Sequence, residues 1–213
     1  MEKSVGIVAK KQTQAIVWNL PNLLSVFRIL TVPFVVICLL WASPSASFLA
    51  ALIFGIASIT DLLDGYIARY QKSETAIGKL LDPLADKLLI NSALIMLIPL
   101  GRIPAWMVVL IVAREVAVTG LRGIASLEGL VIAASGWGKA KTILQTFALV
   151  GLLIHYEYFR IDFHVLGMIL IWIALAITLW SGFDYFYKFY QAHADRVREY
   201  KEGKTGEETN QGP

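Results

Sequence analysis

Long apolar runs alternate with short polar links along most of the chain. Six of these runs are each close to the roughly 20 residues that an α-helix needs to cross the hydrocarbon core of a bilayer. We therefore expect an all-α, polytopic integral membrane protein with six transmembrane helices. Because proline fits only the first turn of a helix, the third helix is expected to start close to Pro83. The six expected helices cover residues 21–41, 48–67, 80–100, 104–121, 140–156 and 163–186.

The composition agrees with a membrane protein. Of the 213 residues, 57% are hydrophobic and 16% are charged, whereas an ordinary soluble domain is about 45–50% apolar and about 25% charged. The formal net charge of +3 says little by itself, and we expect no nucleic-acid partner. The one cysteine, Cys38, lies in an apolar run and cannot form an intrachain disulfide.

The distribution of lysine and arginine predicts how the chain is oriented. With six spans, both termini lie on the same side of the membrane, and that side collects most of the basic residues. The opposite links hold only Arg102 and Arg160. The positive-inside rule therefore predicts that both termini, and the active site with them, face the cytoplasm. We expect the membrane to be a bacterial-type cytoplasmic membrane. The basic residues on the predicted cytoplasmic side are Lys3, Lys10, Lys11, Arg69, Lys72, Lys79, Arg122, Lys139, Lys141, Lys188, Arg196, Arg198, Lys201 and Lys204.

Polar segments flank the apolar region at both ends. Residues 1–18 form a polar N-terminal segment, either a linker or a helix that lies in the membrane interface. Residues 19–190 form the expected six-helix domain. Residues 191–213 form a polar C-terminal tail, and we expect its last part, residues 200–213, to be disordered because it is rich in Glu, Gly and Thr.

Four aspartates lie at the predicted cytoplasmic ends of the second and third helices. Asp61 and Asp64 are three residues apart, and Asp82 and Asp86 are four apart, so on helices each pair points to one face. A carboxylate at membrane depth costs about 2.5–3.5 kcal/mol on insertion scales. Hard divalent cations, which prefer oxygen ligands, would offset this cost and the mutual repulsion. The simpler alternative is two helix ends that carry solvated acids.

The full spacing of this segment resembles a known family. It reads Asp61-x2-Asp64-Gly65-x2-Ala68-Arg69-x8-Gly78-x3-Asp82-x3-Asp86, which is similar at all eight positions to the signature of the CDP-alcohol phosphotransferases. These enzymes transfer a phosphatidyl or similar group from a CDP-linked donor to an alcohol and release CMP. The resemblance implies two Mg²⁺ or Mn²⁺ ions on the four aspartates, with Asp86 also the general base. It further implies that Gly65, Ala68, Arg69 and Gly78 shape the site for the CDP lipid, and that the protein is a homodimer.

Three other segments resemble the branch of this family that makes phosphatidylglycerophosphate. They are Asn19-Leu-Pro-Asn22-x2-Ser25-x2-Arg28, Ala113-Arg114-Glu115 and Gly138-Lys139-Ala140-Lys141-Thr142-x2-Gln145. This resemblance implies CDP-diacylglycerol as donor and sn-glycerol 3-phosphate as acceptor, in phospholipid biosynthesis. The acceptor phosphate needs cations, and the candidates are Arg114, Lys139 and Lys141, with Arg28 and Arg122 as further candidates. In the alternative interpretation, Arg28 snorkels to the interface and the two lysines only anchor a helix.

Two other functions are compatible with parts of the pattern. The same chemistry could use another acceptor, such as inositol phosphate or serine. A divalent-cation transporter would also place acids in the membrane. Such a path needs polar groups through the full depth of the bilayer, whereas here the acids lie near one face and the outer halves of the helices are almost wholly apolar. We therefore favour the transferase.

Overall fold

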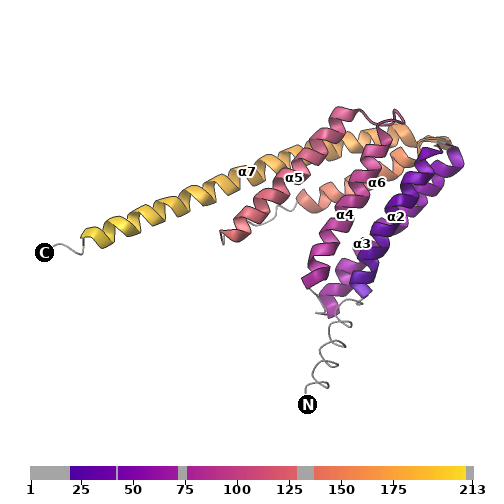
Figure 1. Cartoon of the computed structure of the whole chain (residues 1–213). Helices are drawn as coiled ribbons and strands as arrows, with labels where there is room; N and C mark the ends of the chain where they lie inside the picture. The colour runs from indigo at the N-terminus through magenta and orange to yellow at the C-terminus, as the bar shows by residue number, and fades with distance from the viewer. Residues whose placement is uncertain (1–19, 42, 72–75, 129–136, 210–213) are drawn as a thin grey trace, which may run out of the picture. The chain divides into compact units, whose positions relative to one another are not determined.

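The computed structural model describes residues 20–41, 43–71, 76–128 and 137–209, and the side chains of most of them. Each apolar run of the sequence lies largely on one helix (Figure 1). A two-stranded antiparallel hairpin, β1 (Glu157–Tyr158) with β2 (Ile161–Asp162), joins the last two helices. The helices are α2 (Leu20–Leu40), α3 (Pro44–Gln71), α4 (Ala76–Leu97), α5 (Ala105–Leu127), α6 (Trp137–Ile154) and α7 (Phe163–Thr209).

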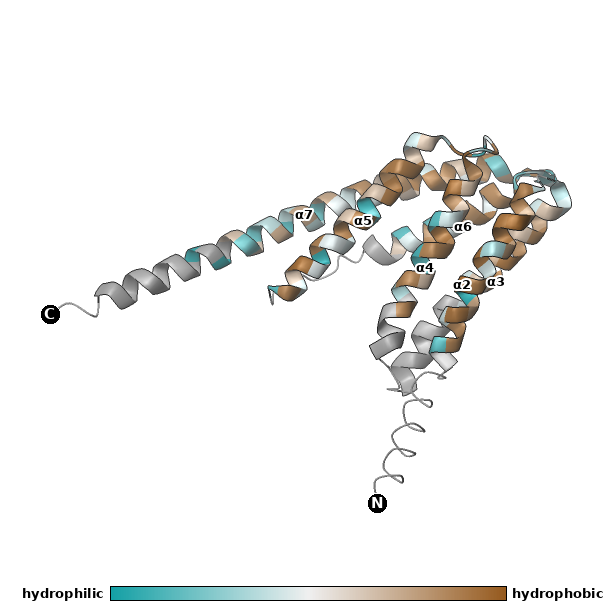
Figure 2. Ribbon diagram, viewed as in Figure 1, coloured by the Kyte–Doolittle hydropathy of each residue, from teal (hydrophilic) through white to brown (hydrophobic). Residues whose placement is uncertain are grey.

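The helices have the apolar surfaces of membrane-embedded segments. Asn22–Leu40 and Phe163–Ala194 are long and apolar enough to cross a bilayer, and Pro44–Thr60 and Ala140–Ile154 are shorter apolar helices. Hydrophobic residues predominate on α2 to α6, and hydrophilic ones gather on the later part of α7 (Figure 2). The described part of the chain is thus all-α apart from the short hairpin, with two candidate spans. The number of six spans and the cytoplasmic termini stay predictions.

The chain divides into two compact units, which are described one at a time. The first holds residues up to Ala105 together with Gln145–Ile171. In it, α2 packs against both α3 and α4. The core is built from large apolar side chains and many alanines, and alanine lets neighbouring helices approach closely. The buried alanines of this bundle are Ala46, Ala50, Ala51, Ala57, Ala85 and Ala93.

Arg102 ties three segments of the first unit together. It lies in the link between α4 and α5, and its side chain is buried. Its guanidinium donates to the carbonyl oxygen of Leu153 at 2.7 Å and to the hydroxyl oxygen of Ser47 at 2.7 Å. A cation at the carbonyl end of α6 is favourable because the last carbonyls carry partial negative charge. Arg102 is therefore a structural residue that links the end of α6 to α3.

The first unit also contains a close contact between the backbones of α6 and α7. A Cβ atom built on Gly167 would lie 2.7 Å from the backbone nitrogen of Leu152, and one on Gly151 would lie 3.0 Å from the Cα of Gly167. Helices in membranes associate through such small residues, because they lack a hydrophobic driving force between them. The two glycines therefore set the distance between α6 and the start of α7.

Two expectations about helix ends are wrong. Pro83 lies well inside α4, which begins at Ala76. Membrane helices tolerate an interior proline when neighbouring groups bond to the backbone atoms that it leaves unpaired, and α2 likewise contains Pro33.

The second wrong expectation about a helix end concerns the C-terminal tail. α7 continues to Thr209, so residues 200–209 are helical rather than disordered. Residues 191–202 are mostly strong helix formers such as Ala, Arg, Lys, Glu and Gln, and the helix continues beyond them although residues 203–209 include Gly203 and Gly206. Residues 210–213 and the N-terminal segment 1–18 lie outside the described residues.

The glycine contact predicts a specific sensitivity to added volume. We expect Gly167→Ala to lower the free energy of unfolding by about 1–3 kcal/mol, the usual cost of overpacking a tight contact. Gly55→Ala is the matched control, because a Cβ at that helical position meets nothing within 4 Å. Unfolding in detergent measures both variants. Equal stability of the two variants would contradict the close contact of α6 and α7.

Candidate functional site

The eight motif positions are divided between two helices of the first unit. Helix α3 carries positions 61 to 69 and helix α4 carries positions 78 to 86. Both stretches are helical, so Asp61 and Asp64 share one face of α3, and Asp82 and Asp86 share one face of α4. Among the eight side chains the structure describes that of Asp86, which is half-buried. The spacing argument is therefore supported by the backbone, while the metal ligands stay a prediction.

Arg28 is buried among polar side chains of α2. Its exposed fraction is 0%, which argues against the interpretation that it snorkels to the membrane surface. Asn22, Ser25 and Thr31, at intervals of three residues, are buried with it. A buried guanidinium is stable only close to opposite charge or hydrogen-bond acceptors. Because α2 packs against the two helices that carry the aspartates, Arg28 is a candidate counter-charge for them.

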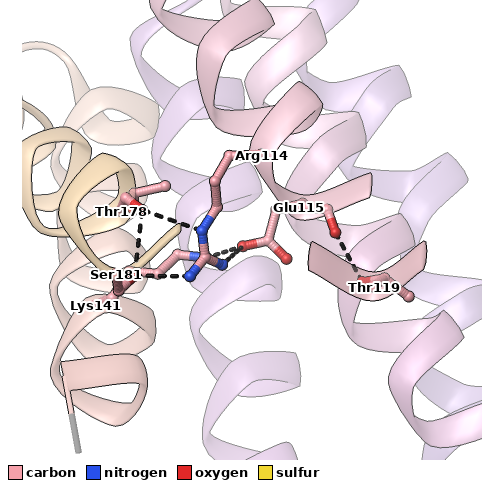
Figure 3. Close-up of polar contacts among 6 residues, drawn as sticks. All are labelled: Arg114, Glu115, Thr119, Lys141, Thr178 and Ser181. Atoms are coloured by element: carbon pink, nitrogen blue, oxygen red, sulfur yellow. Dashed lines mark hydrogen bonds and ion pairs between the residues drawn. The ribbon is translucent and has the colours of Figure 1, made fainter. Parts of the chain in front are cut away.

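The second unit, residues 106–144 and 172–213, contains a polar cluster formed by three helices (Figure 3). Arg114 on α5 donates from Nε to the carbonyl oxygen of Thr178 at 3.0 Å and from Nη2 to the hydroxyl of Ser181 at 2.7 Å. The stem of Arg114 packs at Gly182, where a Cβ would lie 3.0 Å from its Cγ. Arg114 therefore fastens α5 to α7.

Glu115, the next residue on α5, connects this cluster to α6. Its Oε1 forms an ion pair with the ammonium of Lys141, and the Nη1 of Arg114 lies 3.6 Å from the same oxygen. The residue Lys141 is only 4% exposed. A lysine that merely anchors a helix holds its charge in water, so burial in an ion pair argues against that alternative for Lys141.

The structure describes the side chains of four of the five candidate cations for the acceptor phosphate. Arg114 and Lys141 meet at one carboxylate. Arg122 lies further along α5, exposed, with its guanidinium carbon 5.9 Å from the centroid of the Tyr185 ring. Arg28 belongs to the first unit, and the side chain of Lys139 lies outside the described residues.

Sequence reasoning missed the partners of Arg114 on α7. Thr178 and Ser181 are both buried, and with Gly182 they form a polar and small patch inside an otherwise apolar helix. That interruption of the apolar run was a usable signal, because small and hydroxylated residues in membrane helices mark contacts between helices. It did not show which residue they contact.

The two aspartate pairs lie on two apolar helices, one pair on α3 and the other on α4. The family description "CDP-alcohol phosphatidyltransferase" matches residues 18–180. The chain therefore belongs to the CDP-alcohol phosphatidyltransferase family, an enzyme family, as the eight motif positions predict.

Several curated proteins are similar over nearly their whole length. The CDP-diacylglycerol–glycerol-3-phosphate 3-phosphatidyltransferase of Bacillus subtilis is 41% identical over 187 residues, which cover 82% of this chain and 97% of that protein. The protein of the same name from Rickettsia bellii is 41% identical over 79% of this chain and 93% of its own length. A probable phosphatidylglycerophosphate synthase of Mycobacterium tuberculosis is 38% identical over 85% and 89%.

The contacts of Arg114 predict that lysine cannot replace it. An ammonium cannot reproduce the planar fork that reaches Thr178 and Ser181 at once. We expect Arg114→Lys to lose about 1.5–3 kcal/mol of unfolding free energy, the usual range for hydrogen bonds to a charged group. Arg122→Lys, the same change on the exposed side of the same helix, should lose much less. Comparable melting temperatures of the two variants in detergent would refute the structural role of Arg114.

Proposed function

We propose that the protein transfers a phosphatidyl group from CDP-diacylglycerol to sn-glycerol 3-phosphate, giving phosphatidylglycerophosphate and CMP. The observation that carries this proposal is the similarity to proteins of that name over most of both chains, at about two in five identical residues. The complete motif supports the donor half of the reaction. The partly buried Arg114 on α5 and the buried Lys141 on α6 support a phosphorylated acceptor.

The donor set of the motif fits hard divalent cations. Carboxylates are the protein ligands that Mg²⁺ and Mn²⁺ prefer, and we assign two such ions to Asp61, Asp64, Asp82 and Asp86. The ions would neutralise the donor's pyrophosphate and stabilise charge on its oxygens as the transfer proceeds. Gly65, Ala68 and Gly78 leave room beside the helix backbones for the CDP group, and Arg69 is a candidate contact for its phosphates.

Asp86 is the proposed general base. Its carboxylate would accept the proton of the acceptor hydroxyl while the hydroxyl oxygen attacks the phosphorus that bears the diacylglycerol. The bond from that phosphorus to the oxygen of the CMP phosphate breaks, and CMP leaves. A carboxylate whose free pKa is near 4 is a weak base, but it suffices when the transition state requires only partial proton transfer. The half-buried position of Asp86 allows access from solvent.

The acceptor phosphate is best matched by Lys141. Its ammonium is buried and charged in an ion pair, whereas Arg114 already directs two of its nitrogens to α7. An uncharged acceptor such as serine would not need these cations, and inositol phosphate stays the alternative within the family. Lys139, Arg28 and Arg122 are further candidates for phosphate contacts.

The proposed setting is a cytoplasmic membrane crossed by six helices. The acyl chains of the donor would stay in the lipid, and the water-soluble acceptor would reach the aspartates from the cytoplasm. Both termini on the cytoplasmic side follow from the distribution of Lys and Arg. The homodimer is proposed from the family resemblance alone.

The decisive test is CMP release by purified protein in detergent with CDP-diacylglycerol and Mg²⁺. We expect release with glycerol 3-phosphate, none with inositol phosphate, serine or glycerol, and loss of activity on chelation of the metal, because carboxylates alone cannot neutralise the donor's phosphates. Release with a different acceptor would refute the assigned acceptor. No release from folded protein with any acceptor would favour cation transport instead.

The base assignment predicts the effect of removing one charge. Asp86→Asn should reduce kcat by about 10²–10⁴-fold, the usual contribution of a general base, while binding of CDP-diacylglycerol stays measurable. Single-turnover CMP release and equilibrium lipid binding give the two quantities. A variant with near-normal kcat would show that Asp86 does not take the proton.

A further inference from the structure

The carboxylate of Glu115 is the junction of the polar cluster in the second unit. Lys141 on α6 forms an ion pair with Oε1, and Arg114 approaches the same oxygen at 3.6 Å (Figure 3). The Glu115 side chain is 19% exposed and that of Lys141 is 5% exposed. One anion therefore lies between two cations, which leaves the three side chains with a net positive charge.

Arg114 is held from the side opposite Glu115. Nε and Nη2 bond to Thr178 and Ser181, and the hydroxyl of Ser181 also donates to the carbonyl oxygen of Thr178 at 3.2 Å. Its stem packs at Gly182. A guanidinium held at two nitrogens has a fixed direction, so its remaining nitrogen presents a fixed positive charge to Glu115. The helix α7 thereby restrains the Glu115 carboxylate through Arg114.

Lys141 needs such restraint more than an arginine does. Its ammonium is a point charge on a flexible four-carbon stem with three donors. The ion pair with Glu115 fixes one direction of that ammonium. Without a fixed partner, a lysine at a helix start extends its charge toward water.

We propose that Glu115 is a positioning residue that holds the Lys141 ammonium in place for the phosphate of the acceptor. Arg114 contributes by holding Glu115. This inference rests on the proposed function, because Lys141 must bind the acceptor. By charge alone, removal of the Glu115 carboxylate would strengthen binding of the acceptor, because a carboxylate near a phosphate repels it. The sign of the effect on acceptor binding therefore separates positioning from simple repulsion.

The test compares KM for each substrate in wild type, Glu115→Gln, Lys141→Met and the double variant. We expect Glu115→Gln to raise the KM for glycerol 3-phosphate at least about tenfold, in the range found when one partner of a buried charge pair is removed, and to leave the KM for CDP-diacylglycerol nearly unchanged. The double variant should be no worse than Lys141→Met alone, because residues that act through one contact are not additive.

Glu128→Gln is the matched control. Glu128 is also in the second unit and pairs with His193 on α7 at 3.2 Å, so the same change removes a carboxylate from a contact with no proposed role in binding. It should leave both KM values unchanged. A role of Glu115 in stability alone would lower the melting temperature and change both KM values together.

Three results would overturn the proposal. They are an unchanged or lower KM for glycerol 3-phosphate in Glu115→Gln, a double variant whose two defects multiply, and equal effects on both substrates.

If Glu115→Gln does not fold, Glu115→Asp decides the question, because it keeps the charge but withdraws it from Lys141. A selective rise in the acceptor KM of Glu115→Asp supports positioning, and the absence of such a rise refutes it. A wild type that does not use glycerol 3-phosphate refutes the proposed function and this inference together, whereas an active wild type isolates the role of Glu115.

Discussion

A charge inside an apolar helix bundle needs an opposite charge or a full set of hydrogen bonds, and this requirement governs the described structure. Transferring an unpaired ion from water into an apolar medium is far costlier than any single contact can offset. Arg28, Arg102 and Lys141 are nevertheless buried. The described partners of Arg102 and Lys141 lie on other helices, so these two buried charges also fasten helices to one another.

Arg102 and Arg114 meet this requirement in the same way. Each donates to a main-chain carbonyl oxygen, that of Leu153 for Arg102 and that of Thr178 for Arg114, and also to a serine hydroxyl on a neighbouring helix. Arg102 does so in the first unit and Arg114 in the second. A planar guanidinium suits this pairing because its donors diverge at fixed angles. The two arginines are therefore comparable structural ties, although only Arg114 lies beside residues with a proposed role in catalysis.

Sequence patterns predicted the elements well and their contacts poorly. Hydropathy located each helix, because an apolar run of spanning length has few other stable conformations. The proline rule misplaced the start of α4, because a membrane helix tolerates an interior proline when neighbouring groups bond to the freed backbone atoms. The composition of residues 200–213 did not show that α7 continues to Thr209. The motif identified the family from eight spaced positions. By contrast, the bond from Arg114 to Ser181 joins residues 67 apart, and only packing in three dimensions selects such a pair.

The difference between arginine and lysine explains how the cluster on α5, α6 and α7 divides its tasks. Arg114 has two nitrogens bonded to α7 and a third near Glu115, so its charge serves mainly to hold helices and a carboxylate. Lys141 contacts that carboxylate with a compact ammonium whose three donors can turn toward more than one anion. A flexible lysine needs a fixed partner to keep its charge in one place inside an apolar bundle. In this cluster the arginine and the glutamate provide that rigid support.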